Sequence, residues 1–173
     1  MEMQNKIKML ERYLGFPVHR EDLIPESKNR YDESFSYWLC QRFYGKEEQM
    51  RIAIGKTTEI LTELIRNKSN NKLIAIYFSL LGNLYYLRGD FTKSINCFMK
   101  SSSYNKNDLG AWLELAFALR AYGDFTAFEG IIFNLEGIYG EWKNDADAKL
   151  SKEKVLDMVS KQTNQSRLWD QTN

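Results

Sequence analysis

The tetrapeptide Gly89-Asp90-Phe91-Thr92 recurs unchanged as Gly123-Asp124-Phe125-Thr126, a spacing of 34 residues from position 89 to position 123. Glycine supplies the positive φ that a tight turn between helices requires, and the aspartate that follows can cap the free amides of the next helix. The recurrence of both residues therefore predicts two helical hairpins that turn in the same register.

The apolar positions around these turns repeat with the same spacing. A large aromatic residue, a leucine, a small residue and a second large apolar residue occur in order in both copies: Phe78, Leu81, Gly82 and Tyr85, then Trp112, Leu115, Ala116 and Leu119. This order resembles the opening W-x-x-L-G-x-x-Y of the tetratricopeptide repeat (TPR), which has the same period. The resemblance covers residues 75–108 well and residues 109–140 moderately.

Departures from the family pattern concern the packing of the two helices within each hairpin. In the first copy, Ser94 and Ser101 stand where the family usually has small alanines. In the second copy, Phe128 stands at the position equivalent to Ser94, where a small residue normally lets the helices approach closely. Either the helix shifts by one residue to use Ala127 instead, or this hairpin opens wider than usual.

Apolar stripes at helical spacing predict helices along most of the chain. The expected helices run over residues 2–14, 47–66, 72–88, 91–104, 108–122 and 125–138. One more helix is expected from the stripe Phe35, Trp38, Leu39 and Phe43, with Asp32 as a possible N-cap and Gly45 at its end. Gly15 follows the first helix and can end it in the left-handed conformation. Pro17 and Pro25 bracket a polar stretch to Tyr31, which we expect to be an ordered loop because proline removes a backbone donor.

The resemblance implies an all-α fold, a right-handed superhelix of stacked antiparallel helix hairpins. We expect a single domain over residues 1–162. Its parts are an N-terminal helix and loop (1–31), a divergent hairpin (32–71), two TPR units (75–140) and a C-terminal capping helix (141–162). The polar tail over residues 163–173 is expected to be mobile apart from Leu168 and Trp169. If this Leu-Trp pair enters the groove of a neighbouring chain, a homodimer results.

Charge and composition exclude several function classes. The chain has 173 residues, with 24 Lys and Arg against 23 Asp and Glu, and no basic block. A nucleic-acid binder is therefore not expected. The most apolar stretch, residues 73–87, is interrupted by polar residues and is shorter than the roughly 20 residues of a membrane span. The charged N-terminus lacks a signal-peptide core, and Cys40 and Cys97 fit a reducing compartment, so we expect a cytoplasmic protein.

No pattern in the sequence indicates an enzyme, a metal or a cofactor. Gly55-Lys56-Thr57 ends like a phosphate-binding loop, but that motif requires glycine where this chain has Met50. His19 is the only histidine, so a transition-metal site lacks ligands. Two carboxylates at the start of a polar helix, such as Asp145 and Asp147, more often complement the helix dipole than bind a cation. We therefore predict no catalytic residue and no metal ligand.

A second stripe on the first helix of each copy predicts a binding surface. In the TPR family these positions line a concave groove that receives a partner segment. The predicted groove residues are Ile76, Ser79, Asn83, Tyr86, Leu113, Phe117 and Arg120. A face that mixes apolar, aromatic and polar side chains in this way is typical of an interaction site. Either a partner fills the groove, or the chain's own N-terminal helix or tail does.

The sequence therefore predicts a protein-interaction module, an adaptor or chaperone that binds a peptide or a partner protein. One TPR subclass grips a C-terminal carboxylate with a lysine and an asparagine on one helix. Here Asn83 is present, but Ser79 replaces the lysine and Glu114 stands at the groove edge, so this mode is disfavoured. Two alternatives stay open. One is a type III secretion chaperone, and the other is a small-molecule or lipid binder, or a rare helical enzyme, with the aromatic groove as its pocket.

Overall fold

The computed structural model describes residues 2–18, 35–106 and 108–131, and this part of the chain is helical with no strand. The helices are α1 (Met3–Leu14), α2 (Phe35–Phe43), α3 (Glu47–Arg66), α4 (Asn71–Leu87), α5 (Phe91–Tyr104) and α6 (Leu109–Tyr122). A further helical segment occupies residues 125–131. The expected all-α class is confirmed for the described residues.

The observed bounds of α1, α3, α4, α5 and α6 differ from the sequence prediction by at most one residue at each end. For α2 the sequence predicted an apolar stripe without bounds. Gly15 ends α1 in the left-handed conformation, with φ of 82°, and Gly45 follows α2 with φ of 72°. Most of the loop predicted between Pro17 and Tyr31, the capping helix and the polar tail lie outside the described residues.

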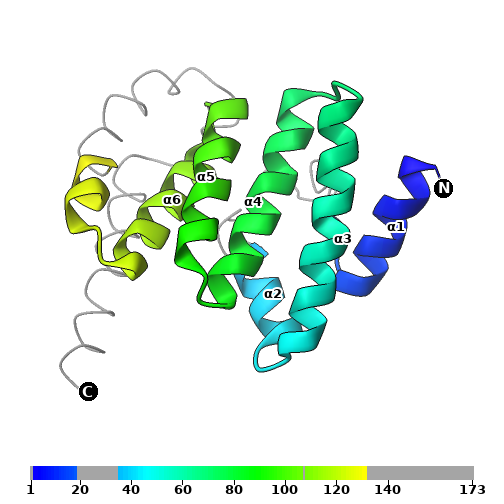
Figure 1. The fold of residues 1–173 in the computed structure, drawn as a ribbon, viewed down its shortest axis with the longest axis horizontal. Helices are drawn as coiled ribbons and strands as arrows, with labels where there is room; N and C mark the ends of the chain where they lie inside the picture. Colours follow the sequence, from blue (N-terminus) through cyan, green and yellow to red (C-terminus); the bar gives the residue numbers. More distant parts are fainter. Residues whose placement is uncertain (1, 19–34, 107, 132–173) are drawn as a thin grey trace, which may run out of the picture.

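From α1 on one side, α3, α4, α5 and α6 follow across the molecule, and α2 lies near one end of α3 and α4 (Figure 1). α3, α4 and α5 lie side by side, α1 flanks α3, and the helical segment 125–131 lies on the side opposite α1. α4 packs most extensively on α5 and also contacts α2, α3 and α6. It is therefore the central helix of the described structure.

Two hydrophobic clusters fill the interior. The first joins α1, α2, α3 and α4, and its largest fully buried side chains include Tyr77, Phe43 and Leu10. The second joins α5, α6 and the segment 125–131 through Phe98, Leu115 and other residues. Because burial of apolar area is the main favourable contribution to folding, these clusters hold consecutive hairpins against each other.

The close approach of α4 and α5 depends on three small residues. A Cβ atom added to Gly82 would lie 2.7 Å from the Phe98 ring, so no larger side chain fits at that point without movement. The Ser94 hydroxyl donates to the Gly82 carbonyl at 2.9 Å, and the Ser101 hydroxyl donates to the Ala75 carbonyl at 2.9 Å. The serines thus act as small residues that also satisfy their own polar groups.

The two repeated turns have the same backbone geometry. Gly89 and Gly123 have φ of 78° and 95°. Each glycine N–H donates to the carbonyl three residues earlier at 3.0 Å, and the N–H of Asp90 or Asp124 donates to the carbonyl five residues earlier at 3.0 Å. This pair of bonds is the Schellman motif, which satisfies carbonyls at a helix end. The predicted positive φ of both glycines is confirmed.

The aspartates of the turns cap the helices that follow. The Asp90 carboxylate accepts from the Lys93 backbone N–H at 3.3 Å, and the Asp124 carboxylate accepts from the Ala127 N–H at 3.0 Å. Each carboxylate therefore accepts a hydrogen bond from one of the free amides in the first turn, as expected of an N-cap.

The second hairpin begins in register with the first, because the helical segment starts at Phe125 just as α5 starts at Phe91. Phe128 is 9% exposed and belongs to the second cluster, whereas Ala127 is only partly buried. The first alternative, a shift of the helix by one residue to use Ala127, is therefore wrong at the start of this helix. A preserved cap and turn hold the register while a large ring takes the inward position.

Candidate functional site

A polar cluster lies at the centre of the predicted groove. Ser79 and Asn83 are one turn apart on α4, and Glu114 on α6 reaches both of them. The Ser79 hydroxyl donates to one carboxylate oxygen of Glu114 at 2.6 Å, and the Asn83 side-chain amide donates to the other at 2.8 Å. The same amide donates to the Ser79 carbonyl at 2.9 Å. The carboxylate thus bridges the first and second repeat copies.

Burial changes the acidity of this carboxylate. Desolvation raises the pKa of Glu114 to about 7, partly offset by the hydrogen bonds from Ser79 and Asn83 and reinforced by the negative charge of Asp108. Burial favours the neutral form of a carboxylic acid, whereas donated hydrogen bonds favour the charged form. Glu114 therefore changes its protonation state near neutral pH.

Tyr86 and Arg120 lie near one another at the far end of the same face. The Tyr86 ring meets the Phe91 ring edge-on, with centroids 5.4 Å apart. Burial raises the pKa of Tyr86, and the positive charge of Arg120 opposes this shift. The Arg120 guanidinium also lies 5.8 Å from the centre of the Phe128 ring. Aromatic faces and a cation therefore meet at this end.

The three aliphatic or phenyl positions of the predicted groove differ in burial. Ile76 and Phe117 are half-buried and pack against the first and second clusters respectively. Leu113 is only 2% exposed and is a member of the second cluster. Leu113 therefore contributes to the core, and its role in binding a partner stays a prediction. Ser79 and Asn83 are also buried, at 8% and 2% exposed.

Glu114 is the residue of this site that the sequence did not assign. The sequence indicates only that Glu114 is an acidic residue at the groove edge that breaks a carboxylate-binding pattern. The available signal was its position 35 residues after Ser79, one more than the repeat, which places it beside the equivalent face of the preceding copy. That the predicted groove residues bind a partner molecule stays a prediction.

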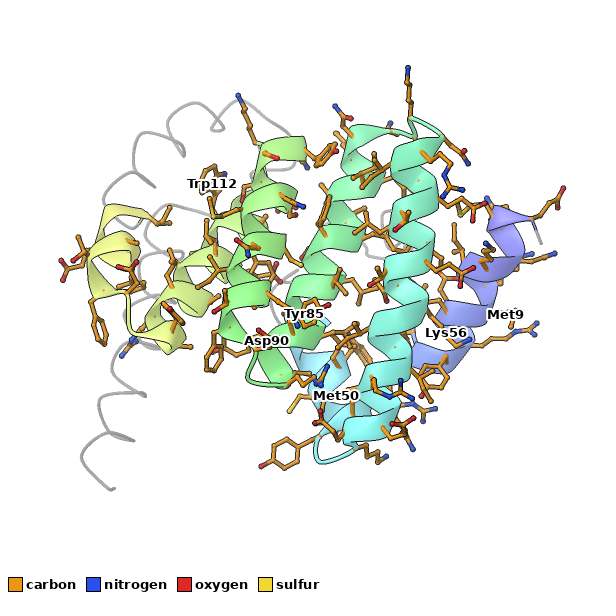
Figure 2. All side chains as sticks on the ribbon, viewed as in Figure 1. Met9, Met50, Lys56, Tyr85, Asp90 and Trp112 are labelled. Atoms are coloured by element: carbon orange, nitrogen blue, oxygen red, sulfur yellow. The ribbon has the colours of Figure 1, made fainter. Side chains whose placement is uncertain are left out.

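The structure does not support a phosphate-binding loop at Gly55-Lys56-Thr57. Gly55, Lys56 and Thr57 lie inside α3, where no loop can wrap a phosphate. Thr57 is 0% exposed. Lys56, labelled in Figure 2, has its ammonium 6.0 Å from the centre of the Tyr13 ring on α1. Lys56 therefore contacts α1 from α3.

The described residues contain no group of three or more His, Cys, Asp and Glu side chains that could hold a metal ion. Cys97 is a buried thiol whose pKa burial raises to about 11, so it is protonated at neutral pH. None of the described helices combines the length and the apolar character needed to cross a bilayer. His19, Asp145 and Asp147 lie outside the described residues.

Comparison of this chain with protein-family models, with curated proteins and with solved structures finds no match.

Proposed function

We propose that this chain is a TPR-like interaction module, an adaptor or chaperone that binds a peptide segment of a partner protein on the face formed by α4 and α6. The two repeated turns, the small residues between α4 and α5 and the order of the helices support a stack of hairpins that continues as a right-handed superhelix. A buried thiol at Cys97 is compatible with the cytoplasmic location that we propose with it.

The observation that carries this proposal is the composition of the α4–α6 face. Half-buried apolar and aromatic side chains, Ile76, Tyr86 and Phe117, flank a polar centre made by Asn83 and Glu114. Interfaces use apolar and aromatic anchors for affinity and a few placed polar groups for specificity. Such a face therefore suits a short segment better than bulk water.

A second candidate function, the binding of a small polar molecule, is favoured by one observation. A carboxylate with a pKa of about 7 that is fixed by two hydrogen bonds is the kind of group that orients a small ligand in a mostly apolar pocket. We rank it below peptide binding, because the flanking residues extend along two helices rather than converging on one point.

Selection from a random library of displayed twelve-residue peptides tests the proposal. We expect the purified chain to enrich binding peptides, and Phe117→Ser and Tyr86→Ser to weaken their binding about tenfold or more. Met99→Ser is the matched control, because Met99 is 56% exposed on α5. Circular dichroism checks that each variant stays folded. Failure to enrich any peptide would overturn the proposed function.

A further inference from the structure

The Glu114 carboxylate has hydrogen-bond donors but no counter-ion among the described residues. Its partners, the Ser79 hydroxyl and the Asn83 amide, are both neutral. None of the ion pairs in the described part of the chain includes it. The charge that acts on it most directly is that of Asp108, which is also negative. A carboxylate in these surroundings lacks the compensation that a buried charge needs.

The cation on this face is directed elsewhere. Arg120 lies on α6 over the Phe128 ring and acts on the Tyr86 hydroxyl, and it is not among the groups that influence Glu114. The polar centre of the face is therefore acidic, while its flanks are apolar and aromatic. Charge complementarity then selects the kind of group that would sit at the centre.

The hydrogen bonds of the carboxylate leave acceptor positions open for such a group. An ionised carboxylate has about four acceptor positions, and the two donors of α4 use one on each oxygen. The two hydrogen bonds also hold the carboxylate in one orientation, which lowers the entropic cost of a further bond.

We propose that the peptide segment bound on the α4–α6 face presents a lysine or arginine side chain to Glu114. The inference rests on the proposed function and adds the charge of the partner to it. In the complex the basic group donates charge-assisted hydrogen bonds to the carboxylate, and apolar residues of the same segment pack on Ile76, Tyr86 and Phe117. Acidic segments are rejected at the same point by like-charge repulsion.

The peptide selection described above tests this inference directly. Peptides enriched by the wild-type chain should contain lysine or arginine at one common position. Replacing that residue by glutamine in a synthetic peptide should weaken binding to the wild-type chain about tenfold or more. The same replacement should change binding to the Glu114→Gln variant less than about twofold, because the carboxylate that reads the charge is gone.

Two controls keep the test specific. Glu48→Gln removes an exposed carboxylate of α3 that pairs with Arg51, and it should select the same basic peptides as the wild type. Glu114→Lys should reverse the preference toward acidic peptides. If a Glu114 variant fails to fold, the lysine and glutamine peptides are still compared on the wild-type chain, with salt added to screen the pair.

Each outcome decides between the two proposals. Enriched peptides without a common basic residue would overturn the inference and leave the proposed function standing. No enriched peptide at all would overturn both. In a third outcome, the wild-type chain forms a dimer that the Glu114→Gln variant does not form. That result would show that a second copy of the chain binds the α4–α6 face, and it would overturn the proposed binding of a partner's basic segment.

Discussion

The hairpin that starts with α4 and the one that starts with α6 share the tetrapeptide Gly-Asp-Phe-Thr and the same turn, yet they pack differently. The phenylalanine of the tetrapeptide shows the difference. Phe91 is half-buried against Tyr86, whereas Phe125 is 58% exposed. In the second copy Arg120 replaces Tyr86 and lies over the Phe128 ring instead. An identical local sequence therefore produces the same turn but not the same packing.

The small position of the first helix shows the same contrast. Gly82 lets the Phe98 ring approach its Cα closely, and the Ser94 hydroxyl donates a hydrogen bond to the Gly82 carbonyl. Ala116, at the equivalent position, is 0% exposed, and the inward position of the next helix is filled by Phe128. The first hairpin is held by backbone proximity and serine hydroxyls, and the second by a larger apolar side chain.

The largest effect is expected from truncating the second cluster. Leu113→Ala should cost about 2–5 kcal/mol of unfolding free energy, because it leaves a cavity around a side chain that is 2% exposed. Phe117→Ala, one turn away on the same helix and only half-buried, should cost less. Urea denaturation of both variants measures this. Equal losses would show that the two residues are core to the same degree.

A methyl group added between α4 and α5 tests the close approach in the first hairpin. Gly82→Ala should cost about 1–3 kcal/mol, since the new Cβ would meet the Phe98 ring at 2.7 Å. Ala116→Gly tests the second hairpin, where we expect a loss of only about 1 kcal/mol from helix propensity. A Gly82→Ala variant with a higher melting temperature than the wild type would contradict the close packing.

Because the Glu114 carboxylate joins the two copies, we expect the free energy of unfolding to depend on pH. Folding raises the pKa of Glu114 from 4.5 to about 7, so the folded chain binds this proton more tightly than the unfolded chain. The stability that it contributes is present below pH 4.5 and is lost as the pH rises through about 7. Within that window the loss is on the order of 1 kcal/mol per pH unit.

Glu114→Gln has no proton to lose, so its stability relative to the wild type should increase between about pH 5 and pH 8. Denaturation curves at the two pH values measure the difference in unfolding free energy between the variant and the wild type. Because both proteins share all other carboxylates, the contributions of those groups cancel in this difference. Glu48, Glu59 and Asp90 have lowered pKa values, so they titrate in the acidic range and are common to both proteins. A difference that does not change with pH would remove Glu114 as the coupled group.

The smallest effect tests the feature that the two hairpins share. Gly89→Ala and Gly123→Ala should each cost about 1 kcal/mol, because both glycines have positive φ. Gly55→Ala is the matched control: Gly55 lies inside α3 with open space around an added Cβ, so alanine should stabilise by up to about 1 kcal/mol. Thermal melts compare all three. Unequal effects at Gly89 and Gly123 would break the equivalence of the turns.

Local features were predictable because they depend on neighbours in the chain. Helix bounds follow from apolar spacing, the positive φ of Gly89 and Gly123 from the turn, and the caps of Asp90 and Asp124 from the amides that follow. The groove stripe was also predictable as a face. Which of its residues are buried was not, since the burial of Leu113 depends on elements far away in sequence.

The sequence by itself determined where five of the described helices, α1, α3, α4, α5 and α6, start and stop and that two hairpins turn alike, because capping, glycine geometry and side-chain period act within a few residues. The tertiary structure alone decided that Phe91 is half-buried and Phe125 is exposed, that Phe128 points inward, and that Glu114 meets Ser79 and Asn83. Those outcomes depend on side chains that come together only when α4, α5 and α6 pack, and burial, hydrogen bonding and pKa are properties of that packed environment.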